Sequence, residues 1–399
     1  MTAELSHWLN AARCLPDEAR RGTLVGRAWV PGRPGGPAVV AVRDDRVVDL
    51  TSRDTPTLSE LFNTEDPLGE VRGRIGYAPV VGSLADVLAN SAADRWDEAT
   101  PRLLSPSDLQ AIKASGVTFV ASLLERVIEE QAAGDAGRAE SIRAAIHDAI
   151  GTSLASVRPG SDEAMRLKQE LTRRGVWSQY LEVGIGPDAE IFTKCQPMSS
   201  VGTGAEIGVL ESSSWNNPEP EVVLAVSGGG DVVGATLGND VNLRDIEGRS
   251  ALLLGKAKDN NASCSMGPFV RLFDEDYGLD DVHACEVALT VEGVDGYRLT
   301  GHSSMREISR TPRELVNQAI GPHHRYPDGL MLFLGTMFAP VEDRDEAGQG
   351  FTHHMGDLVE ISTPALGSLV NRVNRCGDVA PWTFASGALM RNLAARGLL

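Results

Sequence analysis

The sequence has no long run of apolar residues. Its N-terminal stretch, MTAELSHWLNAARCL, lacks the apolar segment of a secretory signal, and no later segment reaches the length of a membrane span. We therefore expect a soluble, cytoplasmic protein that does not contact membranes.

Cysteines are few and show no pairing pattern. The five cysteines lie at Cys14, Cys195, Cys264, Cys285 and Cys376, without CxxC spacing. Their odd number and scattered positions indicate buried or free thiols in a reducing compartment.

Positive charge is also scarce. Lysine and arginine together number 37 against 55 aspartates and glutamates, which gives a formal net charge of −18. Nucleic acids and anionic membranes require basic patches, so we expect neither as a partner. A small anionic substrate remains compatible with this charge, because a few local cations can bind it.

The chain is predicted to have two parts with an overall α+β fold. Residues 23–50 form short β-rich runs, and a capping box of Thr57 and Glu60 opens a short helix. The proline-containing stretch TPRLLSPSDL indicates a linker near residue 105. Residues 1–105 are therefore expected to form a small α+β domain.

Residues 106–399 are expected to form the second domain. Helical patterns occupy about 120–175, with an interruption at Gly134–Asp135, and we interpret this region as a lid. After Trp177, short runs of Val, Ile and Thr alternate with turn residues, which indicates mostly β structure.

One predicted hairpin places carboxylates at both of its ends. The runs EVVLAV and DVVGATL are joined by three glycines. A two-residue turn at Gly229–Gly230 puts Asp240 opposite Glu219, and a turn one residue later puts it opposite Glu221. In both registers the three carboxylates share one face, because side chains alternate along a strand. A three-residue loop would break this parity.

Three neighbouring carboxylates repel one another unless a cation neutralises them. An all-oxygen set favours Mg²⁺, with Mn²⁺ or Ca²⁺ as alternatives, over Zn²⁺. The sequence therefore predicts a divalent metal site at Glu219, Glu221 and Asp240. The alternative is that these side chains lie on a solvated face.

Five stretches resemble, in order and spacing, the fumarylacetoacetate hydrolase superfamily; they are NNPEPEVVLAV, GNDVNLRDIEG, GKAKDNNASCSMGPFV, YPDGLMLFLGT and GFTHHMGDLVEISTPALGSLVN. The resemblance covers roughly residues 110–399 and implies a mixed β-roll catalytic domain. It also implies Mg²⁺ or Mn²⁺ bound by Glu219, Glu221 and Asp240, and assembly as a homodimer or homotetramer. The N-terminal segment resembles that of bacterial members that dehydrate 2-keto-3-deoxypentonates, namely the xylonate and arabinonate epimers.

The resemblance implies three catalytic residues. Lys258, rather than Lys256, matches the lysine that precedes the SCxxGPF segment, and it would stabilise negative charge on the substrate. Arg244 would hold either Asp245 or the substrate carboxylate. Glu125 matches a conserved acid of the family and would act as general acid or base, or else belong to a charged solvent-facing stripe with Glu129.

Two positions depart from the hydrolase pattern. Ser122 stands where hydrolases have the histidine that helps to activate water, and Glu247 stands where they often have glutamine. Both departures argue against hydrolysis.

The remaining candidates are hydroxyl and backbone groups. Gly335 and Thr336 match the family's substrate-carboxylate site, and Ser303 and Ser304 are candidates for binding substrate hydroxyls or for capping turns. The adjacent pairs His323–His324 and His353–His354 are interpreted as structural or surface histidines, because neighbours on a strand point to opposite faces.

These residues predict a Mg²⁺-dependent hydro-lyase for a small anionic keto acid. It would remove a C3 proton and the C4 hydroxyl of a 2-keto-3-deoxypentonate and yield 2,5-dioxopentanoate. One alternative is an acylpyruvate or β-diketone hydrolase, or an oxaloacetate-type decarboxylase. The other is a non-catalytic module that binds a metal and a keto acid.

Overall fold

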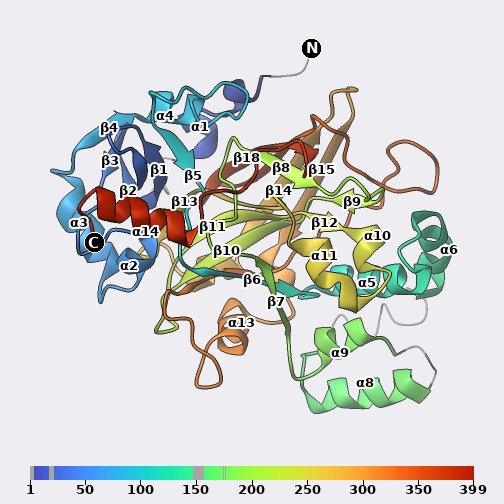
Figure 1. Ribbon diagram of the computed structural model, residues 1–399. Coiled ribbons are helices and arrows are strands. Elements are labelled where there is room, and N and C mark those ends of the chain that lie inside the picture. Colours follow the sequence, from blue (N-terminus) through green and yellow to red (C-terminus); the bar gives the residue numbers. More distant parts are fainter. Residues whose placement is uncertain (1–3, 18–21, 147–156, 174, 176) are drawn as a thin grey trace.

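The computed structural model describes residues 4–17, 22–146, 157–173, 175 and 177–399. Its centre is an 11-stranded mixed sheet with the order β4-β3-β2-β1-β13-β11-β10-β16-β6-β7, and β5 pairs with β1 (Figure 1). The strands of this sheet are β1 (Leu24–Val30), β2 (Gly36–Arg43), β3 (Arg46–Asp49), β4 (Val80–Ser83), β5 (Arg102–Leu104), β6 (Ala111–Gly116), β7 (Glu190–Cys195), β10 (Pro220–Val226), β11 (Val232–Asp240), β13 (Cys264–Leu272) and β16 (Leu330–Phe333).

A second sheet has five strands in the order β15-β14-β17-β18-β8. Its strands are β8 (Glu206–Val209), β14 (Glu286–Glu292), β15 (Arg298–Ser304), β17 (Leu358–Thr363) and β18 (Gly367–Arg375), and the short pair β9 (Asn216–Asn217) and β12 (Asn242–Leu243) stands apart. Most pairings are antiparallel, but β16 with β6 and β18 with β8 are parallel. The α+β class and the mixed β architecture are thus confirmed.

Strand β10 is buried on both faces, which explains why EVVLAV is an almost continuous apolar run. Val222 and Leu224 alternate with Val223 and Ala225 between two different apolar clusters. The first cluster lies between the two sheets, and the second is completed by N-terminal residues such as Phe62. The hairpin with the three carboxylates therefore runs through the centre of the protein.

The N-terminal strands continue the central sheet. Leu24 and Val25 of β1 pair with Arg271 and Val270 of β13. No separate sheet belongs to the described part of residues 1–105, and the division into two domains near residue 105 stays a prediction.

The C-terminal helix lies beside the strands of the N-terminal part (Figure 1). Helix α14 (Ser386–Ala395) packs next to β2, where Asn392 donates a hydrogen bond to the Gly35 carbonyl at 2.7 Å and Arg396 donates to that of Pro37 at 2.6 Å. The other helices of the N-terminal part are η1 (Leu5–Trp8), α1 (Ala11–Cys14), α2 (Leu58–Phe62), α3 (Pro67–Ile75) and α4 (Leu84–Ala89). Of the predicted capping box of α2, the Thr57 half is confirmed, since Thr57 accepts from the Glu60 amide at 3.1 Å.

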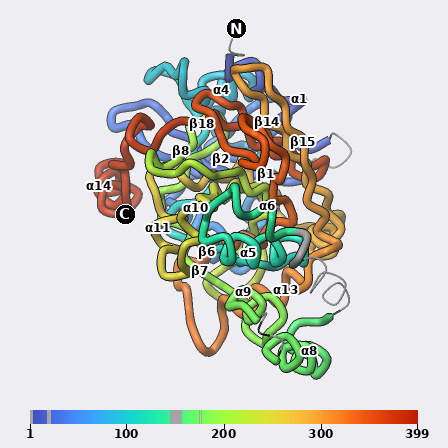
Figure 2. Tube along the Cα trace, turned by 90° about the vertical axis from the view of Figure 1, so that its right-hand side faces the viewer, coloured from blue at the N-terminus to red at the C-terminus, as the bar shows by residue number. Residues whose placement is uncertain are grey.

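Four helices form a layer on one side of the sheets, which faces the viewer in Figure 2. They are α5 (Val120–Ala132), α6 (Ala136–Ile146), α8 (Asp162–Arg173) and α9 (Gln179–Ile185), and they share an apolar cluster of their own. The remaining helices are α10 (Arg244–Glu247), η4 (Ala251–Leu253), α11 (Leu254–Lys258), α12 (Leu279–His283), η5 (Met305–Glu307) and α13 (Pro312–Ala319). Helical structure within 120–175 is confirmed for the described residues, whereas its role as a lid stays a prediction.

Helix α5 ends at the predicted interruption and there meets α10. Ala133 adopts a left-handed conformation (φ 55°), and a Cβ on Gly134 would lie 2.4 Å from the Asp245 carbonyl oxygen. A Cβ on Gly248 would lie 3.0 Å from the Glu129 carbonyl oxygen. These two glycines let the backbones approach closely, and this contact brings acids of α5 to Arg244. In the described part of the chain, no helix combines the length and apolarity needed to cross a membrane.

Candidate metal centre

The hairpin of β10 and β11 differs from prediction at its turn but not at its ends. Ser227 pairs with Asp231 across a three-residue loop, Gly228–Gly230, so the predicted two-residue turn is wrong. By itself, this loop would place Asp240 on the face of the hairpin opposite to that of Glu219 and Glu221. A bulge at Val233 adds one residue to β11, because Val226 pairs with Val232 but Ala225 pairs with Gly234.

The bulge restores the parity that the loop breaks. Glu221 lies opposite Gly238, and the Asp240 amide donates to the Glu219 carbonyl at 3.1 Å. Each of the three carboxylates offers an oxygen atom, and these oxygens all lie within 4.8 Å of one another. The side chains are buried, so the alternative of a solvated face is excluded.

Two lysines lie against this triad. Lys258 of α11 contacts Glu219 at 2.8 Å and Asp240 at 3.2 Å, and Lys194 of β7 contacts Asp240 at 2.9 Å. Burial would raise the pKa of Asp240, but the two ammonium groups hold it below its usual value. Burial would lower the pKa of Lys258, but Asp240 and Glu219 raise it. Lys258 therefore keeps its charge in the site.

Glu221 is the triad member without a cationic partner. Among the described residues no lysine, arginine or histidine forms an ion pair with it, and the Gly335 amide donates to it at 2.5 Å. Burial and the charges of Asp240 and Glu219 raise the pKa of Glu221 well above its usual value. A buried carboxylate in this state is costly to ionise, and a divalent cation would relieve that cost. The donor set and its burial thus fit a hard metal ion such as Mg²⁺.

Gly335 approaches Glu221 because it lacks a side chain. Its backbone is left-handed (φ 88°), and a Cβ there would lie 2.0 Å from the Thr118 hydroxyl oxygen. The predicted substrate residue Gly335 is therefore beside the triad. Thr336 follows it and accepts a hydrogen bond from the Phe338 amide at 3.1 Å.

A network of acids and arginines extends from the triad into the helical layer. Arg126 of α5 contacts Glu219 at 2.5 Å, Glu129 at 2.5 Å and Glu247 at 3.4 Å. Arg244 contacts Glu129 at 2.6 Å and Glu125 at 3.0 Å. Glu219 is thereby connected through two guanidinium groups to the predicted general base.

Glu125 is held by two arginines. Arg143 of α6 contacts it at 2.9 Å, in addition to Arg244. It is buried, so the alternative of a solvent-facing stripe with Glu129 is wrong. Ser122, which stands one turn before Arg126, donates to the Phe119 carbonyl of its own helix at 3.0 Å.

Arg244 does not hold Asp245. Its third contact is the Pro340 carbonyl at 2.8 Å, and its guanidinium lies 4.2 Å from the Trp215 ring centroid. Asp245 instead accepts from Ser213 at 2.8 Å. All three guanidinium nitrogens of the buried Arg244 form hydrogen bonds, so in this geometry Arg244 orients Glu125 and Glu129.

The two hydroxyl candidates have different hydrogen-bond partners. Ser303 accepts from the Met337 amide at 3.0 Å, next to Thr336, whereas Ser304 donates to Glu286 of β14 at 2.5 Å. His353 is buried beside Asp357 at 3.4 Å, and His323 is exposed, as expected for structural and surface histidines.

The sequence interpretation missed Lys194, Arg126 and Glu190. Burial and the charge of Glu247 raise the pKa of Glu190 to about 7. Arg126 lies one residue after Glu125 and three before Glu129, so an i to i+3 ion pair could have been expected. Lys194 gave no such signal, because only the packing of β7 against α11, where the Lys194 ammonium donates to the Lys258 carbonyl at 2.7 Å, brings it close to Asp240.

Comparison with known proteins agrees with this fold and centre. A family model described as the fumarylacetoacetate (FAA) hydrolase C-terminal domain matches residues 169–374, about half of the chain. The chain belongs to this family.

Two curated relatives are similar in sequence to about half of this chain. A protein of Haloferax volcanii named "Probable 2-keto-3-deoxyxylonate dehydratase" is 34% identical over 194 residues, which are 49% of this chain and 63% of the relative. The "2-dehydro-3-deoxy-D-arabinonate dehydratase" of Saccharolobus solfataricus is 28% identical over 186 residues, 47% of this chain and 59% of the relative. The matches span about three fifths of each relative.

A solved structure entitled "2-keto-3-deoxy-D-arabinonate dehydratase complexed with magnesium and 2,5-dioxopentanoate" is similar in fold. Its TM-score is 0.57 at 21% identity, over 88% of this chain and 99% of that chain. This similarity concerns the fold.

Proposed function

We propose that the protein is a Mg²⁺-dependent dehydratase that converts a 2-keto-3-deoxypentonate, of the xylonate or arabinonate configuration, to 2,5-dioxopentanoate and water. The observation that carries the proposal is the buried triad Glu219, Glu221 and Asp240, in which Glu221 forms no ion pair with any cation of the described residues. The names of both curated relatives support this reaction over others of the family.

Glu219, Glu221 and Asp240 would hold the metal ion. When bound, a divalent ion supplies positive charge that polarises a keto group and acidifies the adjacent C–H bond. The chain's own residues must then bind the anionic substrate, transfer protons and exclude water.

Positive charge for the substrate comes from Lys258, which stays protonated between Glu219 and Asp240. A fixed ammonium group of this kind stabilises negative charge as it develops on the keto acid. Gly335 and Thr336 would contact the substrate carboxylate from the end of β16. Burial of the triad keeps bulk water out.

Proton transfer is assigned to Glu125. It would take the C3 proton and then, as a carboxylic acid, return a proton to the C4 hydroxyl, which leaves as water. The unsaturated keto acid then rearranges to the aldehyde. Arg143 and Arg244 orient the Glu125 carboxylate. Arg143 on α6 must release one carboxylate oxygen before Glu125 accepts a proton there. Elimination needs no attacking water, which agrees with Ser122 in place of a water-activating histidine.

A panel of keto acids tests the proposal. The purified full-length chain with Mg²⁺ is incubated with both 2-keto-3-deoxypentonates, an acylpyruvate and oxaloacetate, and a semialdehyde dehydrogenase reports 2,5-dioxopentanoate. We expect semialdehyde from at least one pentonate. Pyruvate from the acylpyruvate, or carbon dioxide from oxaloacetate, without semialdehyde would instead indicate a hydrolase or decarboxylase. Calorimetric binding without turnover would indicate a non-catalytic module.

A further inference from the structure

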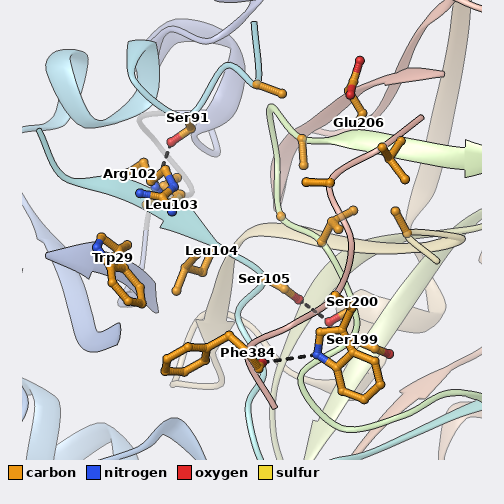
Figure 3. A pocket seen from close by; sticks show the side chains of 18 of the residues that line it. Trp29, Ser91, Arg102, Leu103, Leu104, Ser105, Ser199, Ser200, Glu206 and Phe384 are labelled. Atoms are coloured by element: carbon orange, nitrogen blue, oxygen red, sulfur yellow. Dashed lines mark hydrogen bonds between the residues drawn. The ribbon is translucent and has the colours of Figure 1, made fainter. Parts of the chain in front are cut away.

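A cavity of about 300 Å³ lies apart from the metal centre, where the N-terminal part meets the C-terminal end of the chain (Figure 3). Its walls come from β1, β5, the segment 198–206 and the segment 379–384. None of the triad or of the arginine network lines it. Its volume is at the lower end of the range for small-molecule sites.

Aromatic rings form much of the wall. Trp29 and Phe384 meet edge to face, with ring centroids 5.6 Å apart, and Trp96 and Trp382 also line the cavity. Trp96 and Trp382 keep exposed fractions of 49% and 43%. Large rings left this open at a cavity are typical of surfaces that receive the flat apolar body of a ligand.

The cavity also holds a cation, Arg102, for which the described residues provide no ion pair. The Arg102 guanidinium lies 4.1 Å from the ring centroid of Trp96 and 5.6 Å from that of Trp29. In the described part of the chain no carboxylate comes within ion-pair distance of it, and its Nε is buried without a hydrogen-bond partner. Burial lowers the pKa of Arg102, and the nearby charge of Glu98 offsets only part of that shift. In a chain with a net charge of −18, a cavity arginine without an ion pair among the described residues is an unusual feature.

The other charged groups of the cavity are already satisfied. Arg27 faces Asp108 at 3.5 Å and donates to the Ser105 and Ser107 carbonyls. Glu206 lies at the far end from Arg102 in Figure 3 and accepts from Asn374 at 3.1 Å. Arg102 is therefore the group that sets the charge of a ligand.

We propose that this cavity is a second binding site, for a small organic anion with a flat aromatic body, whose anionic group pairs with Arg102. The body lies among Trp29, Trp96 and Trp382. A guanidinium already oriented by stacking binds a carboxylate or a phosphate through two parallel hydrogen bonds. The site is separate from the proposed dehydratase centre and does not depend on that assignment.

Binding of model compounds to the full-length protein tests the proposal. Tryptophan fluorescence and calorimetry are followed with 2-naphthoate, 2-naphthyl phosphate and the neutral 2-naphthamide. We expect one or both anions to bind at least tenfold more tightly than the amide, and the stronger anion identifies the carboxylate or phosphate class. Equal binding of all three compounds, or no binding of either anion at millimolar concentration, overturns the proposal.

Substitutions locate the bound compound. Arg102→Gln should lower the affinity for the anion that binds at least tenfold. Trp382→Ala, which replaces an exposed ring, should lower the affinity for both anions severalfold without unfolding the chain. Arg298→Gln is the control, since that side chain is 64% exposed and pairs with Glu292 elsewhere on the surface. Thermal unfolding verifies that each variant is folded. Unchanged binding in both cavity variants, or loss of binding in Glu221→Gln, would place the compound elsewhere and refute the site.

Discussion

The backbone amide of Asp240 donates a hydrogen bond to the carbonyl oxygen of Glu219 at 3.1 Å, directly across the central hairpin. This pairing puts the two side chains on the same face and brings Glu221, two residues along, to the same place. The metal centre is thus a consequence of strand register, which the bulge at Val233 sets.

Replacement of Glu221 tests the metal centre. Glu221→Gln removes a buried carboxylate for which the described residues provide no ion pair, so the metal-free variant should be more stable than metal-free wild type by about 1–3 kcal/mol. The variant should also lose the rise in melting temperature that Mg²⁺ produces in wild type. Urea and thermal unfolding, with Mg²⁺ or with EDTA, measure both effects.

The variant Glu292→Gln, at the partly exposed end of β14, serves as the control for Glu221→Gln and should respond to Mg²⁺ as wild type does. If Glu221→Gln keeps the full Mg²⁺ response, the triad does not bind the ion.

Replacement of Lys258 should change metal affinity and rate in opposite directions. Lys258→Met removes a cation that lies against Glu219 and Asp240, so Mg²⁺ should bind more tightly. The same change removes stabilisation of negative charge on the substrate and should lower kcat by about 10²–10³-fold. Calorimetry and the coupled assay give the two values.

Lys256→Met is the matched control, because Lys256 is exposed two residues away on the same helix and should be replaceable without effect. A normal kcat in Lys258→Met would remove this lysine from the catalytic groups.

Replacement of Glu125 separates catalysis from packing. Glu125→Gln should leave Mg²⁺ affinity unchanged and lower kcat by about 10²–10⁴-fold, as expected for loss of a general base. In wild type, kcat should fall at low pH as Glu125 becomes protonated, and the residual kcat of the variant should not show this fall. Steady-state kinetics across pH measure this.

Glu140→Gln is the control for Glu125, since Glu140 binds the same Arg143 at 2.6 Å but is 67% exposed. Full activity in Glu125→Gln would show that another group takes the proton.

Acid should weaken the fold through Asp357. Burial alone would raise its pKa, but hydrogen bonds from Arg344 and His353 lower it to about 2, below the ordinary value of 3.8. A carboxyl group with a lowered pKa in the folded state stabilises the protein above its unfolded pKa and loses that contribution as pH falls through the folded value. The loss should be about 2 kcal/mol.

Asp357→Asn should remove this pH-dependent part. The difference in unfolding free energy between wild type and variant should stay constant from pH 7 to pH 5 and shrink between pH 4 and pH 2. Urea unfolding at several pH values measures it, and a difference that does not change with pH would contradict the prediction.

Local patterns in the sequence were sufficient for several features. Alternation along EVVLAV and DVVGATL indicated the hairpin, the acids at its ends indicated a metal site, and Gly134 indicated the end of α5. These features depend on residues close together in the chain, where side-chain direction follows from backbone geometry. The five separated stretches that resemble the family supplied the fold.

The turn could not be predicted in the same way. A three-residue loop and a bulge compensate each other, and both depend on how β11 pairs with its neighbours. The contacts of Arg244 were also beyond prediction, because Asp245 is adjacent in sequence whereas Glu125 and Glu129 come from a helix more than a hundred residues earlier.

The amino-acid sequence by itself determined which residue types are available at the centre: three carboxylates on one hairpin, a lysine before β13, and serine where hydrolases have histidine. Only the tertiary structure decided which charges meet. Arg126 reaches Glu219 and Lys194 reaches Asp240, whereas Glu221 has no ion-pair partner in the part of the chain that the structure describes. Ion pairs form only between side chains that the packing of α5, β7 and β10 brings within a few ångströms. Because these groups are buried, the ion pairs of Glu219 and Asp240 and the lack of one at Glu221 all have a large effect on free energy.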